Sequence, residues 1–209
     1  MKKNSMNIPN ILSILRCLLV PIFVLTLLYM RGCGIWGYIV PAAVYGITAF
    51  TDMLDGKIAR KYNLVTDFGK FIDPLADKFM VISSMIAILV WMLLNKDIVP
   101  ALVFVWVVLI ILLRELGVTS LRLVVAGKSG IVVAASILGK IKTVSQMIGA
   151  VVIILEPAIP MVIKGVGAID FVCENHILSY ISMAVMAFTT LFSGIDYLKA
   201  YMPYIDSNK

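Results

Sequence analysis

The sequence predicts an all-α, multi-pass membrane protein with six transmembrane helices, preceded by a short interfacial N-terminal helix. Of the 209 residues, 61% are apolar and 14% are charged, whereas a soluble domain is nearer half apolar and a quarter charged. The mean hydropathy is +1.02. A chain of this length has too little interior to bury so many apolar side chains, and a disordered chain would be less apolar. At about 20 residues per crossing, residues 1–209 form a single domain that crosses the bilayer about six times.

Six apolar segments follow one another along the chain, at residues 11–30, 36–58, 71–94, 98–126, 132–155 and 177–201. Each is expected to be a helix, because backbone groups in hydrocarbon must pair within their own segment. The stretch Met6–Arg16 mixes polar and apolar residues, which predicts a short interfacial helix there. No cleavage site of small residues follows the first apolar segment, so we interpret that segment as a retained span.

The distribution of basic residues predicts the orientation. With six spans, both termini share one side of the membrane with the 59–70 and 127–142 connections. Only three of the 18 Lys and Arg residues fall on the other side: Arg31, Lys96 and Lys164. Because Lys and Arg accumulate in cytoplasmic loops, both termini are expected to face the cytoplasm from the cell (inner) membrane. Topology and contact with anionic membrane lipids also explain the net charge of +6, so no nucleic-acid partner is expected.

The cysteines and several of the acids indicate no further site. Cys17, Cys33 and Cys173 form an odd set without metal-ligand spacing, and whether Cys33 and Cys173 pair stays open. Six acids are interpreted as loop or interfacial charges: Asp67, Asp97, Glu156, Asp170, Glu174 and Asp206.

Four aspartates gather at the cytoplasmic ends of two consecutive segments: Asp52, Asp55, Asp73 and Asp77. At about 100° per residue, the first two share an arc of a helix with Gly56 and Ala59, and the last two continue a stripe that starts at Gly69. Four like charges placed together would repel or protonate unless cations held them. Carboxylate oxygens suit Mg²⁺ or Mn²⁺, and a pair of such ions supports in-line phosphoryl displacement.

A structural interpretation of these aspartates is the alternative. Asp73-Pro74 would then be an N-cap followed by proline at the first helical position, and Asp52 and Asp55 would pair with Lys57 or Arg60. Four acids at helical spacing, in a membrane protein with only 12 Asp and Glu residues, favour the functional interpretation.

The aspartates belong to a longer pattern, Asp52-x-x-Asp55-Gly56-x-x-Ala59-Arg60 and, after eight residues, Gly69-x-x-x-Asp73-x-x-x-Asp77. This pattern resembles the signature of the CDP-alcohol phosphatidyltransferase family, and the resemblance covers essentially the whole chain. It implies transfer of a phosphatidyl group from a CDP-linked lipid to an alcohol, with release of CMP, two divalent cations and a homodimer. By position, it implies that all four aspartates bind metal and that Asp77 is also the general base. It further implies a CDP site formed by Asp52, Gly56, Ala59, Arg60 and Gly69.

Basic residues within the apolar segments indicate the acceptor alcohol. Arg114 and Arg122 lie about 80° apart around a helix, and Lys140 and Lys142 begin the next polar cluster. Buried cations need an anion, and a phosphate on the acceptor would supply it. We therefore expect these four residues to bind the acceptor phosphate, which favours glycerol 3-phosphate or inositol phosphate. An Arg114–Glu115 or inter-helix ion pair, with Lys140 and Lys142 as topology anchors, is the structural alternative.

Secondary motifs narrow the acceptor by resemblance: Asn7-Ile8-Pro9-Asn10 with Arg16, Arg114-Glu115, Gly139-Lys140-x-Lys142-Thr143-x-x-Gln146 and Asp196-Tyr197. They are similar to the bacterial branch of the family that makes phosphatidylglycerophosphate from CDP-diacylglycerol and sn-glycerol 3-phosphate. Two alternatives stay open. One is another member, making cardiolipin, phosphatidylserine or phosphatidylinositol phosphate. The other is a divalent-cation transporter, whose acids would be spread over several spans near the midplane.

Overall fold

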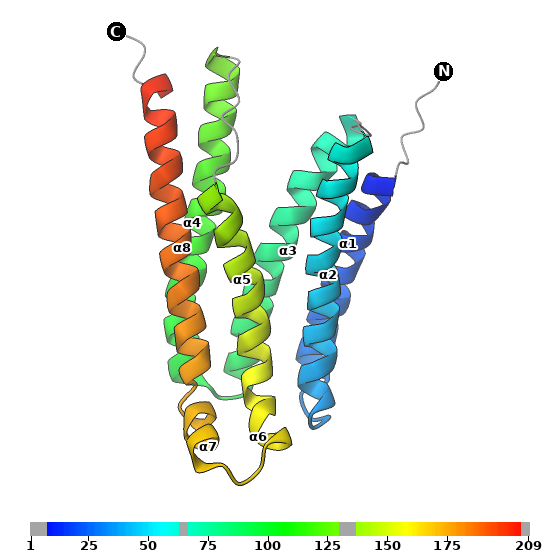
Figure 1. Cartoon of the computed structure of the whole chain (residues 1–209), viewed down its shortest axis with the longest axis vertical. Helices are drawn as coiled ribbons and strands as arrows, with labels where there is room; N and C mark the ends of the chain where they lie inside the picture. The colour runs from blue at the N-terminus through cyan, green and yellow to red at the C-terminus, as the bar shows by residue number, and fades with distance from the viewer. Residues whose placement is uncertain (1–7, 63–66, 130–136, 206–209) are drawn as a thin grey trace.

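The computed structural model describes residues 8–62, 67–129 and 137–205, and this part of the chain is helical without strands (Figure 1). The elements are α1 (Ile8–Tyr29), α2 (Trp36–Tyr62), α3 (Asp67–Leu94), α4 (Ile98–Ser129), α5 (Ile137–Leu155), the 3₁₀ turn η1 (Glu156–Ala158), α6 (Ile159–Val162), α7 (Gly167–Glu174) and α8 (Ile177–Ile205). The prediction of an all-α protein is confirmed for the described ranges.

Five stretches in the described residues are long and apolar enough to span a bilayer: Asn10–Tyr29, Ile72–Leu94, Ile98–Val125, Ile137–Val162 and Ile177–Met202. This is the pattern of a multi-pass membrane protein. Helix α2 has 27 residues but is not among the five, and the side chains of its last turns, from Asp52 on, lie outside the described residues. The predicted sixth span is therefore not confirmed.

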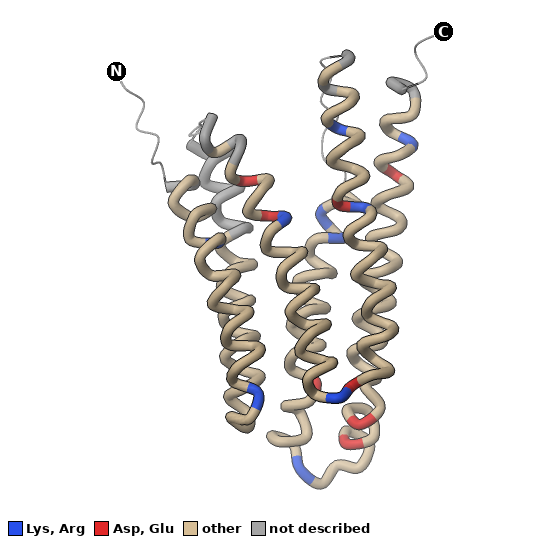
Figure 2. The backbone as a smooth tube through the Cα atoms, turned by 180° about the vertical axis from the view of Figure 1, so that it is seen from behind, with Lys and Arg blue, Asp and Glu red and all other residues tan. Residues whose placement is uncertain are grey.

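The long helices form two groups that are joined by contacts between their helices. Helix α1 packs against α2 and α3, and α8 packs against α4 and α5, while α3–α4 and α2–α5 contacts join the two groups. Figure 1 shows the start of α1 and the end of α8 at one end of the bundle, here called the terminal end, and α6 and α7 at the opposite, far end. Figure 2 shows the charged positions gathered toward the two ends, with an uncharged stretch between them. That stretch suits the hydrocarbon layer.

Helix α1 buries one stripe that runs its whole length: Asn10, Ser13, Arg16, Val20, Phe23 and Leu27. The stripe is apolar in its second half, where it joins the main core, and polar toward the terminal end. Because α1 is continuous from Ile8 and these polar side chains face protein, a separate interfacial helix is not confirmed.

The far end contradicts one interpretation from the sequence. Glu156 is fully buried, and its carboxylate accepts hydrogen bonds from the backbone N–H of Leu178 at 2.9 Å and of Ser179 at 2.8 Å, as well as from the Ser179 hydroxyl. The first N–H groups of a helix have no partner within it, so Glu156 satisfies the start of α8. The assignment of Glu156 as a loop or interfacial charge is wrong.

At the far end, Asp97 lies beside His176, and Cys33 and Cys173 form no disulfide bond. Asp97 Oδ1 lies 3.7 Å from His176 Nε2; partial burial raises the pKa of the Asp97 carboxyl, and His176 opposes that rise. Cys33 is exposed, Cys173 is buried, and both are free thiols.

Candidate functional site

Five of the predicted site residues lie on the last turns of α2: Asp52, Asp55, Gly56, Ala59 and Arg60. Helix α2 continues without a break to Tyr62, so all five positions are helical, as their spacing predicts. Their side chains lie outside the described residues, and their predicted roles stay predictions.

Helix α3 carries the second half of the predicted pattern. It begins at Asp67, so Gly69, Asp73 and Asp77 lie one above the other on one face. The alternative in which Asp73 caps a helix starting at Pro74 is wrong, because Asp73 is already inside α3. Gly69 is buried, and the Asp77 side chain is 55% exposed.

Helix α1 contacts both of these aspartates. The Ser13 hydroxyl donates to Asp73 Oδ1 at 2.6 Å, and Arg16 Nη1 forms an ion pair with Asp77 Oδ1. Ser13 and Arg16 are 0% and 1% exposed. The sequence places Ser13 and Arg16 among the polar residues of the expected interfacial stretch, and Arg16 also in a motif, but it predicts no contact of either with the aspartates. The available signal is the three-residue spacing, which continues the apolar stripe of α1.

Two cavities open beside these aspartates at the terminal end. One, of about 130 Å³, lies between α3, α4 and α5, and the other, of about 260 Å³, lies between α3, α4 and α8. Both are lined by Asp77, Lys78, Arg114 and Glu115. Lys142 lines the smaller cavity, and the larger one adds Asp73 and Arg122. Since pockets for drug-sized ligands measure about 300–1,000 Å³, these volumes suit a small polar molecule.

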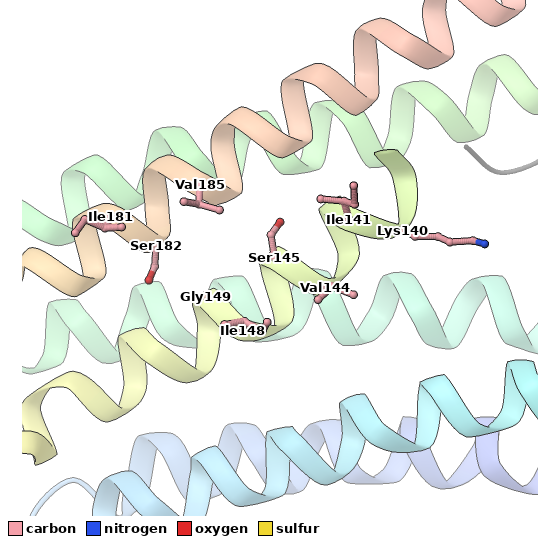
Figure 3. Close-up of a pocket in the computed structure, with 9 residues that line it drawn as sticks. All are labelled: Lys140, Ile141, Val144, Ser145, Ile148, Gly149, Ile181, Ser182 and Val185. Carbon is pink, nitrogen blue, oxygen red and sulfur yellow. The ribbon is translucent and has the colours of Figure 1, made fainter. Parts of the chain in front are cut away.

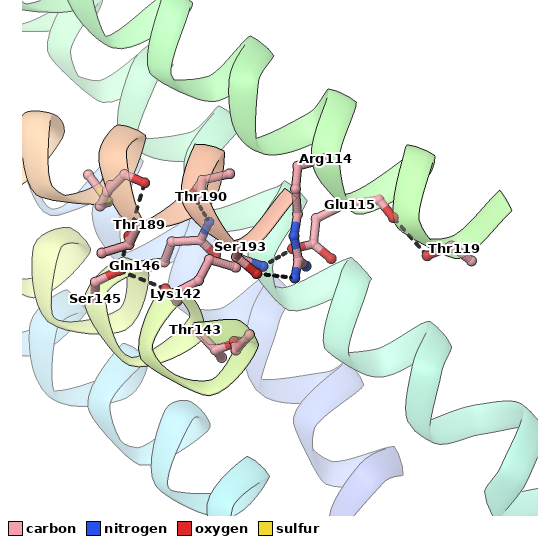
Figure 4. Close-up of polar contacts among 12 residues, drawn as sticks. Arg114, Glu115, Thr119, Lys142, Thr143, Ser145, Gln146, Thr189, Thr190 and Ser193 are labelled. Atoms are coloured by element: carbon pink, nitrogen blue, oxygen red, sulfur yellow. Dashed lines mark hydrogen bonds and ion pairs between the residues drawn. The ribbon is translucent and has the colours of Figure 1, made fainter. Parts of the chain in front are cut away.

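Arg114 is fixed from three sides, as Figure 4 shows for its polar contacts. Its Nη2 donates to Ser193 Oγ at 2.7 Å, and its Nη1 donates to Glu115 Oε1 at 3.2 Å. The guanidinium also lies 5.2 Å from the centre of the Tyr197 ring, a distance typical of a cation–π contact. A Cβ at Gly139 would lie 3.4 Å from that ring and 3.7 Å from Arg114 Nη2. The planar cation is thus held in one orientation at the cavities.

Lys142, on α5, lines the smaller cavity together with Arg114. It is 3% exposed, and its ammonium forms an ion pair with Glu115. One turn further along α5, Gln146 Nε2 donates to Thr190 Oγ1 at 3.0 Å, which ties α5 to α8 (Figure 4). Glu115 therefore bridges Arg114 of its own helix and Lys142 of α5, and the predicted Arg114–Glu115 ion pair is part of this cluster.

Lys140 lies apart from the other predicted phosphate ligands. It lines neither cavity described above, but a third one of about 490 Å³ between α5 and α8, whose other lining residues are mostly apolar. Figure 3 shows its side chain extending past the end of that cavity. Lys140 and Lys142 are two residues apart, hence about 200° apart around the helix, and cannot share a face.

The described residues supply only part of the predicted metal site. Among them, no group of three or more His, Cys, Asp or Glu side chains could hold a metal ion. They do supply Asp73 and Asp77, one turn apart, and carboxylate oxygens are the donors that hard divalent cations prefer. The donor chemistry therefore fits Mg²⁺ or Mn²⁺, provided that Asp52 and Asp55 of α2 complete the set.

The charges around the two cavities are unequally distributed. Lys78, Arg114, Arg122 and Lys142 bring four positive charges, and Glu115 brings one negative charge outside the predicted metal ligands. Lys142 is buried, Lys78 and Arg114 are partly buried and Arg122 is exposed; cations in excess of their counter-ions in such a place favour an anionic ligand. The site can thus bind a small anion next to a half-exposed carboxylate.

Comparison with known proteins shows similarity to one family over most of the chain. The family model described as CDP-alcohol phosphatidyltransferase matches residues 6–194. A Bacillus subtilis protein named CDP-diacylglycerol–glycerol-3-phosphate 3-phosphatidyltransferase is 36% identical, over 91% of this chain and 93% of its own length. A Mycobacterium tuberculosis protein named probable phosphatidylglycerophosphate synthase is 34% identical over 92% and 80%. A Rickettsia felis protein with the same name as the Bacillus protein is 35% identical over 95% and 97%.

Proposed function

Because this chain belongs to the CDP-alcohol phosphatidyltransferase family and is therefore an enzyme of that class, we propose that it uses CDP-diacylglycerol and sn-glycerol 3-phosphate. The products are phosphatidylglycerophosphate and CMP. Two kinds of observation support this choice: relatives at about 35% identity carry names for this reaction, and four cations line cavities beside Asp77. The second observation carries the proposal, because it calls for an acceptor that itself bears a phosphate.

The donor half of the site is proposed on α2 and α3. Asp52, Asp55, Asp73 and Asp77 hold two divalent cations, Mg²⁺ or Mn²⁺, which when bound neutralise the diphosphate and stabilise departing CMP. The CDP group is held by Asp52, Gly56, Ala59, Arg60 and Gly69. The acyl chains stay in the bilayer, so only the headgroup needs a polar pocket.

The acceptor half is proposed on α4 and α5. Arg114, Arg122 and Lys142 bind the phosphate of glycerol 3-phosphate, while Lys140, placed outside the cavities, stays a prediction for this role. An acceptor held there presents its hydroxyl to Asp77, which lines both cavities. Asp77 takes the hydroxyl proton, the acceptor oxygen bonds to the phosphorus that carries diacylglycerol, and the bond from that phosphorus to CMP breaks. No covalent enzyme intermediate is required.

The placement in the cell also remains a proposal. The terminal end, with the two cavities, faces the cytoplasm, both termini lie there, and the six-span chain sits in the inner membrane. The low number of Lys and Arg residues in the opposite loops supports this orientation. A homodimer is expected from the family resemblance.

An acceptor assay tests the proposed reaction. Purified protein in detergent or nanodiscs receives CDP-diacylglycerol with glycerol 3-phosphate, an inositol phosphate, serine or phosphatidylglycerol, and CMP release is measured. We expect CMP release only when glycerol 3-phosphate is the acceptor. Release with another acceptor would assign a different family reaction, and uptake of Mn²⁺ into protein-containing liposomes without CMP release would favour a transporter.

Substitution of Arg114 is expected to weaken acceptor binding. Hydrogen bonds to a charged group contribute about 1.5–3 kcal/mol, so Arg114→Ala should raise the KM for glycerol 3-phosphate about 10–100-fold. The KM for CDP-diacylglycerol should change little. The matched control is Arg31→Ala, which removes an arginine bonded to a backbone carbonyl at the far end. An unchanged acceptor KM in Arg114→Ala would remove Arg114 from the proposed phosphate site.

A further inference from the structure

The polar half of the α1 stripe faces the proposed metal ligands. Helix α1 and helix α3 both start at the terminal end and run in the same direction (Figure 1). Along α1, Ser13 and Arg16 are one turn apart, or about 4.5 Å along the axis, and along α3, Asp73 and Asp77 are separated by about 6 Å. Each α1 residue therefore meets one α3 carboxylate, Ser13 with Asp73 and Arg16 with Asp77.

The Ser13 hydroxyl donates to a carboxylate of another element, and the Ser179 hydroxyl, which donates to Glu156 at the far end, is a second case. Thr51 and Ser84 are also buried, and their hydroxyls donate to backbone carbonyls of their own helices, at 2.7 and 2.9 Å. Such bonds within a helix are the usual outcome for serine and threonine. Ser13 instead donates across to another helix at 2.6 Å, and its partner is a carboxylate.

Arg16 is a buried cation, which is strongly unfavourable without a counter-ion. It is 1% exposed, whereas the side chain of its partner Asp77 is 55% exposed. The guanidinium therefore contacts Asp77 from the protein side while that carboxylate borders both cavities.

We propose that Ser13 and Arg16 are positioning residues of the metal site, which hold the Asp73 and Asp77 carboxylates in the orientation that binds divalent cations. This inference rests on the proposed function. A carboxylate that is already oriented by a hydrogen bond loses less rotational freedom when it binds an ion. Loss of such an outer contact typically weakens metal binding 10–100-fold.

Direct measurement of Mn²⁺ binding to the full-length protein in detergent tests the proposal, with the electron paramagnetic resonance signal of free Mn²⁺ as readout. Ser13→Ala and Arg16→Lys should each raise the dissociation constant about 10–100-fold. Because Arg16→Lys keeps the positive charge, a weaker affinity for Mn²⁺ in this variant reports a change in how the Asp77 carboxylate is positioned and not the loss of a charge. Ser13→Thr keeps the hydroxyl and should restore binding, and the KM for glycerol 3-phosphate should stay unchanged in all three variants.

The matched control is Ser84→Ala, which removes a buried hydroxyl of α3 that bonds only within that helix. It should bind Mn²⁺ like the wild type, and thermal unfolding without metal verifies that each variant is folded. If Ser13→Ala does not fold, Arg16→Lys decides the question. Wild-type affinity in Ser13→Ala and Arg16→Lys, with binding lost in Asp73→Asn, overturns this inference alone. Absence of Mn²⁺ binding by the wild-type protein overturns the proposed metal site as well.

Discussion

Removal of divalent cations from the purified protein is expected to abolish CMP release. Four carboxylates on two helix ends would repel one another without cations, and the diphosphate of the donor would lose the charge neutralisation that favours departure of CMP. Such stabilisation amounts to several kcal/mol, so the rate should fall by at least about 10³-fold. The measurement is CMP release after exhaustive chelation, with residual metal quantified by mass spectrometry, followed by addition of Mg²⁺ or Mn²⁺.

Restored activity after addition of one of these ions separates metal loss from damage to the protein. Circular dichroism before and after chelation verifies that the helices persist. A chelated sample that contains less than one ion per chain and keeps full activity would refute the metal-assisted mechanism.

The Asp77→Asn substitution is expected to have the largest effect among single substitutions. Asparagine has nearly the same shape and can still accept a hydrogen bond from Arg16, but it carries no charge and accepts no proton from the acceptor hydroxyl. General-base catalysis contributes about 10²–10⁴-fold, and loss of a metal ligand adds to this. We therefore expect kcat to fall by about 10³-fold or more, with a small change in the KM for glycerol 3-phosphate, because the proposed phosphate ligands are intact.

Asp97→Asn is the matched control for Asp77→Asn. Asp97 lies at the far end of the bundle beside His176, away from both cavities, so this variant should keep wild-type kinetics. A near wild-type kcat in Asp77→Asn would exclude Asp77 as the general base and as an essential metal ligand.

The sequence predicts which site residues share one face of a single helix. The stripe of Gly69, Asp73 and Asp77 follows from a spacing of four residues, and α3 has that geometry because it begins well before Asp73. The polar residues of α1 are harder to interpret, because a polar face looks the same in sequence whether it meets water or a buried carboxylate. The contact from Ser13 to Asp73 joins residues 60 positions apart, and no local pattern encodes it.

Lys140 and Glu156 also lie elsewhere than the sequence predicts, each for a separate physical reason. Lys140 and Lys142 differ in placement because two residues correspond to about 200° of helix rotation, a consequence that the sequence alone already contains. Glu156 is buried because the start of α8 offers it unpaired N–H groups. That partner lies beyond two short helical elements and a turn, so hydropathy alone assigns Glu156 to water.

The pairing of α1 with α3 also bears on how the enzyme is made. Ribosomes add about 5–20 residues per second, and Asp77 follows Arg16 by 61 positions, so α1 precedes its partner by about 3–12 s. During that interval the Asp77 carboxylate is not available to Arg16, and the length of an arginine side chain allows such a charge to reach the lipid headgroups. The proposed cation-binding centre is thus completed only when the third helix arrives, and a nascent chain that stalls earlier is catalytically silent.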